Sequence, residues 1–154
     1  MNLHPYVVFL PTEQKIKILG AIFGSKSAVD VLKFSLHQGI SKKIYQKDLM
    51  KELPFSNKTI IGNLKSLTKL DILRENMEKM EKEGRIVWVK AYQLSDMGKW
   101  FALLLAEEKD LSQREKIEIL QNVFRTYIRW VRDLSEKLHA ENKMLEDIFM
   151  EEMK

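Results

Sequence analysis

Apolar residues recur at intervals of three or four through the first third of the chain, which is the spacing of amphipathic helices. A first helix is predicted over residues 13–23, with Thr12 as its N-cap. A second helix follows, with Ser25 or Ser27 as its cap, and is expected to end at Gly39 because glycine commonly terminates helices. The chain therefore opens as a mainly helical protein.

Two shorter helices are predicted next, with a tight turn between them. Residues 40–45 form a connector or a short strand, and residues 46–53 form a short helix that Pro54 ends. Ser56 is placed to cap the second of these two helices, over about 57–70. The residues expected on its buried stripe are Ile60, Leu64 and Leu67.

The pattern then changes to that of a β-hairpin. Residues 72–80 and 85–94 are two runs separated by Glu81-Lys82-Glu83-Gly84, and the second is rich in Val, Ile, Trp and Tyr. Ser95 is expected to cap a helix after the hairpin. That helix carries four large apolar residues toward the core: Trp100, Phe101, Leu104 and Leu105.

Beyond Ser112 the chain has no proline or glycine, and its apolar residues follow a heptad pattern interrupted at Glu141. We therefore predict one long helix of some forty residues, which would extend about 60 Å and need a partner. A second copy of the chain is the favoured partner, and folding back onto its own domain is the alternative. The expected dimer interface is Ile117, Leu120, Phe124, Tyr127, Val131, Leu134, Leu138, Leu145 and Ile148.

Charge is distributed unevenly along the 154 residues, whose net charge is +4. Residues 40–90 hold twelve Lys and Arg against seven Asp and Glu, whereas residues 106–154 hold nine against twelve. A basic middle segment favours a polyanionic partner. The absence of cysteine excludes disulfides, thiolate nucleophiles and thiolate metal sites. No apolar run approaches the roughly 20 residues of a membrane span, and we expect a cytoplasmic protein.

The order of elements is that of a winged helix-turn-helix domain, and two stretches resemble a known family. The run from Ser56 to Leu67, followed by Asp71-Ile72-Leu73, resembles the recognition helix of bacterial and archaeal regulators of the arsenic-repressor and multiple-antibiotic-resistance-regulator types (ArsR and MarR). Tyr92-Gln93-Leu94-Ser95-Asp96-Met97-Gly98 resembles the Tyr-x-Leu-Thr-x-x-Gly phrase after their wing. The chain departs from the family in having Ile61-Gly62 where Ser-Arg is frequent, and Asp71 where glycine is usual.

The resemblance implies a homodimeric regulator of transcription that binds double-stranded DNA. Its expected parts are an N-terminal arm and helix (1–25), a winged-helix domain (26–105) and a long C-terminal dimerisation helix (106–154). Helix 57–70 would enter the major groove, and the wing at 72–94 would lie on the flanking backbone or minor groove.

Candidate DNA contacts follow from side-chain chemistry. Asn bonds adenine, and Lys reaches guanine or phosphate, so Lys58 and Asn63 are the first candidates. The wing tip carries Lys82 and Arg85, although Glu78, Glu81 and Glu83 interrupt it. The full set is Lys42, Lys43 and Lys47, with Lys51, as phosphate contacts, then Ser56, Asn57, Lys58, Thr59, Asn63 and Ser66, and Lys82 and Arg85 in the wing.

Other functions have less support in the sequence. An enzyme is disfavoured because there is no glycine-rich phosphate loop and because His4, His37 and His139 lie in separate elements, so no cofactor, metal or catalytic residue is expected. The main alternative is a winged-helix adaptor that binds protein within a transcription or replication complex. A small-molecule effector also stays open, since five aromatic residues offer a lining for it: Trp100, Phe101, Phe124, Tyr127 and Trp130.

Overall fold

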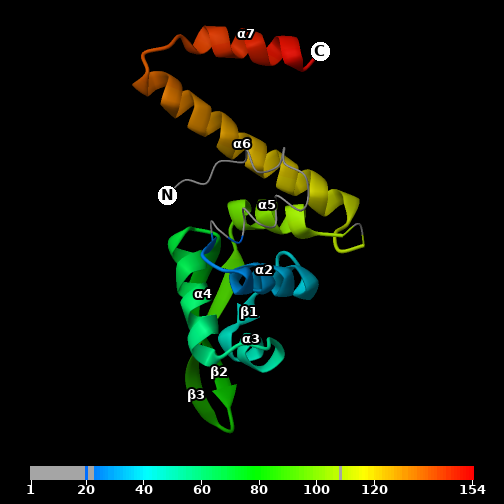
Figure 1. Ribbon diagram of the computed structural model, residues 1–154, viewed down its shortest axis with the longest axis vertical. Coiled ribbons are helices and arrows are strands. Elements are labelled where there is room, and N and C mark those ends of the chain that lie inside the picture. Colours follow the sequence, from blue (N-terminus) through cyan, green and yellow to red (C-terminus); the bar gives the residue numbers. More distant parts are fainter. Residues whose placement is uncertain (1–19, 21–22, 108) are drawn as a thin grey trace.

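Helices form most of the protein, and a small sheet lies among them (Figure 1). The structure is a computed structural model that describes residues 20, 23–107 and 109–154. His4, the predicted cap Thr12 and nearly all of the predicted arm and first helix lie outside the described residues. The hairpin tip and the C-terminal helices lie at opposite ends of the long axis.

Helix α2 (Lys26–Gln38) is the predicted second helix, and the structure confirms both of its ends. The Ser25 hydroxyl accepts a hydrogen bond from the Ala28 backbone N–H at 3.3 Å, so Ser25 rather than Ser27 is the cap. Gly39 follows the helix with a φ of +129°, a value that residues other than glycine rarely adopt. Ala28, Val31 and Leu32 are fully buried in the core.

The two helices of the predicted helix-turn-helix are α3 (Gln46–Glu52) and α4 (Asn57–Lys69). Strand β1 (Ile44–Tyr45) comes directly before α3. The Ser56 hydroxyl accepts from the Thr59 backbone N–H at 3.2 Å, as expected of the cap. The predicted stripe on α4 is buried, with Ile60, Leu64 and Leu67 at most 1% exposed.

The hairpin forms the rest of an antiparallel sheet in the order β1-β3-β2. Strands β2 (Leu73–Lys82) and β3 (Arg85–Leu94) pair along their whole length. The loop is two residues, shorter than the predicted four, because the ladder continues to the pair Lys82 and Arg85. Glu83 and Gly84 both have positive φ, as the tightest hairpin turns require. This mainly helical fold with a small three-stranded antiparallel sheet fits a winged helix.

The base of the wing is fixed to both neighbouring helices. Asp71 has a φ of +58° and ends α4, with the Ile72 N–H donating to the Leu67 carbonyl at 2.9 Å. Helix α5 (Asp96–Leu105) begins at Ser95, whose hydroxyl donates to the Asp71 carbonyl at 2.5 Å. The expected apolar side of α5 faces inward, with Trp100 and Phe101 buried and Leu104 and Leu105 half-buried.

The single long helix predicted beyond Ser112 is wrong, because the segment forms two helices. Helix α6 (Gln113–Lys137) begins with a capping box between Ser112 and Glu115, and α7 is Asn142–Glu152. His139 takes a φ of +55°, and the Ala140 N–H donates back to the Ser135 carbonyl at 3.0 Å. This is the hydrogen-bond pattern by which a left-handed residue, usually glycine, ends a helix.

Helix α7 folds back along α6 instead of continuing it (Figure 1). The rings of Phe124 and Phe149 lie 5.7 Å apart, centroid to centroid. Helix α7 therefore packs on α6, whereas the alternative from the sequence was a helix folded onto the winged-helix domain. None of the helices in the described part of the chain is long and apolar enough to cross a membrane.

Candidate nucleic-acid interface

The exposed face of α4 carries a stripe of lysines. Lys58, Gly62, Lys65 and Lys69 succeed one another at intervals of four, three and four residues, and all are exposed. Within the described residues, none of these three lysines pairs with a carboxylate. Sequence reasoning selected Lys58 and missed Lys65 and Lys69, although their spacing from Lys58 was visible. The stripe presents three unneutralised charges opposite the buried face.

The first turn of α4 presents small polar groups. Ser56, Asn57 and Thr59 are exposed, as is Ser66 two turns later. Ser56 also donates to the Thr59 hydroxyl at 2.9 Å, so these two side chains support each other at the helix start. All four predicted residues therefore lie on accessible parts of the helix.

The expectation that Asn63 faces outward is wrong. Its side chain is buried, with the Asn63 amide Nδ2 donating to the Ser27 hydroxyl at 2.7 Å. The Asn63 Oδ1 accepts from the Ser25 hydroxyl at 3.0 Å. Asn63 stands three residues after Ile60 and four before Leu67, which places it on the buried stripe. It joins α4 to α2 and is not available to a base.

The lysines around α3 divide into two kinds. Lys42, Lys47 and Lys51 are exposed, and within the described residues no carboxylate pairs with them. Lys43 instead donates to the Glu78 carboxylate of β2. The charge of Lys43 is therefore largely matched within the protein, which makes it a weaker candidate for a phosphate contact than the other three.

The Glu78 carboxylate links β2 to the segment that enters α3. Besides Lys43, the Tyr45 hydroxyl donates to it at 2.9 Å. These hydrogen bonds hold the pKa of Glu78 below its ordinary value of 4.5 and raise the pKa values of Lys43 and Tyr45. Glu78, counted from the sequence as an interruption of the basic wing, thus has a structural role in fixing the wing beside α3.

The wing tip lies at the far end of the molecule from α7 (Figure 1). Lys82 and Arg85 face each other across the last pair of the ladder and are exposed. Glu81 and Glu83 lie beside them and are also exposed. The tip is therefore accessible but only weakly basic.

Helix α6 has two apolar faces. Ile119 and Val123 are buried in the core on the side where α6 packs against α5. The predicted dimer residues lie on the other face, where Ile117, Leu120, Phe124, Leu134 and Leu138 are exposed and Tyr127 and Val131 are half-buried. On α7, Ile148 is exposed and Leu145 is half-buried. Much of the seam thus lacks an apolar partner within the described chain.

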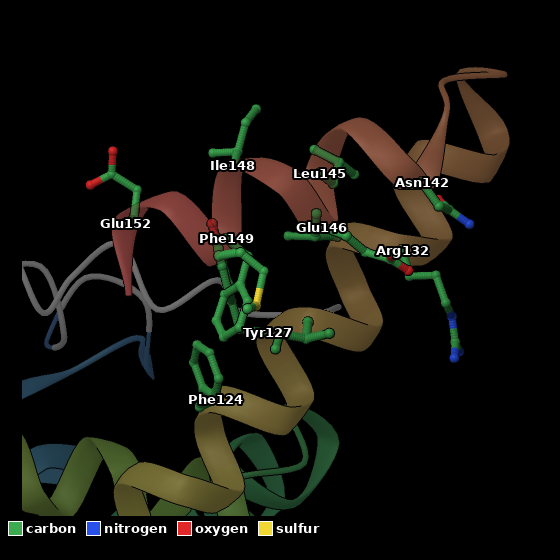
Figure 2. Close-up of a pocket in the computed structure, with 12 residues that line it drawn as sticks. Phe124, Tyr127, Arg132, Asn142, Leu145, Glu146, Ile148, Phe149 and Glu152 are labelled. Carbon is green, nitrogen blue, oxygen red and sulfur yellow. The ribbon is translucent and has the colours of Figure 1, made fainter. Parts of the chain in front are cut away.

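A groove of about 710 Å³ separates α6 from α7 (Figure 2). Phe124, Tyr127 and Phe149 lie toward one another in it, whereas Ile148 points away from α6. The five aromatic residues expected to line an effector pocket are not brought together here. Trp100 and Phe101 are buried in the core, and the Trp130 ring stacks on Tyr127 at 6.4 Å without lining the groove.

The described residues offer little for metal chemistry. They contain no group of three or more His, Cys, Asp or Glu side chains arranged to hold a metal ion. His37 lies 3.8 Å from Asp110, and His139 is used to end α6.

Comparison with known proteins gives only weak structural likeness. No protein-family model matches the chain, and no curated protein matches it. A solved structure described as a possible transcriptional regulator from Methanosarcina mazei Go1 is 16% identical, with 80% of this chain and 84% of that chain covered and a TM-score of 0.40. A likeness at this level supports no conclusion on function. The function is inferred instead from the surfaces of α4, the wing and α6.

Proposed function

We propose that the chain is a transcriptional regulator, not an enzyme, that binds duplex DNA sequence-specifically as a homodimer. The observation that carries the proposal is the lysine stripe on the exposed face of α4, beside the unpaired lysines of α3. Such a regulator acts on the chromosome in the cytoplasm of a bacterium or archaeon, as the resemblance to the ArsR and MarR types suggests.

In the proposal, α4 enters the major groove. Lys58 reaches guanine or phosphate, and Asn57 and Ser66 bond to base edges at either side of it. Gly62 has no heavy atom within 4 Å of the place of a Cβ, so it keeps the centre of this face flat and allows the helix to approach the bases. Lys65 and Lys69 extend the contact along the groove.

The remaining cations bind the phosphate backbone. Lys42, Lys47 and Lys51 flank the first helix of the motif, and Lys82 and Arg85 reach the backbone or minor groove from the wing tip. Phosphate contacts set the register of the protein and supply most of the affinity, whereas base contacts supply the specificity.

The homodimer uses the face of α6 that is largely without an apolar partner among the described residues. Two copies joined along Ile117 and Leu120 would bury these exposed apolar side chains, together with the part of Phe124 that Phe149 leaves exposed. Each copy would then place its α4 on one half-site, and half-sites one turn of DNA apart would bind together. The absence of a continuous long helix changes the shape of this interface but not its apolar chemistry.

The test is selection of preferred sequences from a random duplex pool, followed by affinity measurements on the selected site. Lys58→Ala should weaken binding to the selected site by about tenfold and reduce discrimination against point-mutated sites, as loss of one base contact does. Lys137→Ala removes an equally exposed lysine at the end of α6 and should leave both quantities unchanged.

Two results would contradict the proposal. Failure to bind any duplex at low salt would favour the protein-binding adaptor. Equal losses in Lys58→Ala and Lys137→Ala would show general attraction to a basic protein and not a defined interface on α4.

A further inference from the structure

One face of the wing carries exposed apolar side chains where a solvated ribbon would be polar. Met77, Ile86 and Trp88 are 51%, 70% and 59% exposed. The ladder pairs Met77 with Lys90 and Lys79 with Trp88, and side chains at alternate positions share a face. We call the surface made by Met77, Lys79, Ile86, Trp88 and Lys90 the wing platform.

The wing platform does not belong to the core. Strand β1 pairs with β3 only opposite Tyr92 and Ala91, so the sheet is a two-stranded ribbon where Trp88 lies. The half-buried residues Val87 and Val89 lie on the other side of the ribbon. Within the described part of the chain, nothing buries the platform, so its apolar side chains are not explained by folding.

One cation lies against the exposed indole, and Glu75 and Glu81 share its face of the ribbon. The Lys79 Nζ lies 5.1 Å from the centroid of the Trp88 ring, and Lys90 pairs with Glu75 at 3.4 Å. Lys82 and Arg85 lie at the tip on the opposite face of the ribbon, and no carboxylate pairs with them in the described chain. An exposed aromatic ring beside a cation is a combination that binds single-stranded nucleic acid, because a base stacks on the ring and a phosphate lies beside the cation.

We propose that the wing platform is a stacking site for unpaired DNA bases, with Trp88 as its main contact and Ile86 and Met77 beside it. This inference rests on the proposed function, because α4 holds the duplex while the platform takes a strand that leaves it. The Lys79 ammonium beside the Trp88 ring can meet a phosphate, which favours a nucleic acid over an apolar protein partner. The preferred ligand is a junction between duplex and single-stranded DNA.

The test compares a blunt hairpin duplex with the same duplex bearing a single-stranded thymidine extension. The intact chain should bind the junction about tenfold more tightly than the blunt duplex, since one stacked base contributes about that factor. Trp88→Ala should abolish this preference and leave blunt-duplex affinity unchanged. Trp88→Phe, which keeps an aromatic ring, should retain most of it.

Tryptophan fluorescence gives a second readout. Oligothymidine should quench the emission of the intact chain, because stacking on a base brings the indole against it, and the quenching should be lost in Trp88→Phe. Trp100 is buried and stays in both proteins, so it reports any unfolding of the variant.

The outcomes separate the two proposals. Blunt-duplex binding without a junction preference, or a preference that survives Trp88→Ala, overturns the platform and leaves the regulator proposal standing. Quenching by oligothymidine without any duplex binding supports the platform and contradicts the regulator. A response of Trp88 to anionic phospholipid vesicles and not to DNA would make the platform a lipid-binding surface and overturn the inference.

Discussion

At the scale of single residues, substitution of Asn63 tests whether this side chain stabilises the fold or contacts DNA. Asn63→Ala removes the hydrogen bonds to Ser25 and Ser27 and leaves the buried Ser27 hydroxyl without its donor. We expect the free energy of unfolding to fall by about 1–3 kcal/mol in urea titrations, because the buried Ser27 hydroxyl loses one of its two partners and keeps only the Ser25 hydroxyl at 2.8 Å. Ser66→Ala, on the exposed face, should leave stability unchanged. An Asn63→Ala protein of normal stability but altered base preference would contradict the assignment.

Two glycines provide a matched pair. A Cβ at Gly98 would lie 2.1 Å from the Ile72 carbonyl oxygen, at the junction of wing and α5, whereas one at Gly62 meets nothing within 4 Å. Gly98→Ala should cost about 1–3 kcal/mol through overpacking. Gly62→Ala should stabilise the protein by up to about 1 kcal/mol, since alanine is the better helix former. Thermal unfolding measures both, and equal melting temperatures for the two variants would refute the tight junction.

At the scale of elements, the contact of Glu78 with Lys43 and Tyr45 makes the attachment of the wing depend on pH. Because the pKa of Glu78 is lowered in the folded protein, its contribution to stability is complete above pH 4.5. That contribution is lost as the pH falls through the pKa of Glu78 in the folded protein. Because the pKa of Lys43 is raised in the folded protein, its contribution to stability is complete below pH 10.5. That contribution is lost as the pH rises through the pKa of Lys43 in the folded protein. The contact should therefore stabilise the wing throughout the neutral range.

Glu78→Gln tests this dependence. The intact chain should have the higher melting temperature near neutral pH, and the difference should shrink as the pH falls to about 3. The matched variant is Glu81→Gln. The Glu81 carboxylate is exposed and makes no hydrogen bond or ion pair with the described residues, so this variant should show no such trend. A difference that stays constant from about pH 7 to pH 3 would mean that the carboxylate does not hold the wing.

The elements could be predicted from the sequence wherever a cap or a glycine marked their ends. Ser25, Ser56 and Ser95 begin helices as expected, and Gly39 ends one. The end of α6 could not be predicted, because His139 takes the left-handed conformation that glycine usually supplies, and heptad spacing continues across it. The burial of Asn63 was missed for another reason. A polar residue on an apolar stripe becomes visible only when its partners Ser25 and Ser27 are placed on the neighbouring helix.

At the scale of the whole molecule, the exposed seam of α6 predicts self-association. Leu120 is 54% exposed on this face, and Leu120→Glu places a charge where the second copy should pack. Sedimentation equilibrium should give about twice 18.2 kDa for the intact chain and the single mass for this variant, with weaker DNA binding. The neighbouring exposed substitution Gln121→Glu adds the same charge beside the seam and should leave the dimer intact. A Leu120→Glu protein that stays dimeric would remove the seam from the account.

The central claim is that the surface formed by α4, α3 and the wing tip binds duplex DNA through many cations, and its most direct test is the affinity for duplex DNA as a function of salt. Five cations in each copy, Lys42, Lys47, Lys51, Lys82 and Arg85, are assigned to phosphates. Because each neutralised phosphate releases counterions, the affinity should fall by at least about a thousandfold between roughly 50 and 200 mM salt. An affinity that hardly changes over this range would contradict the account.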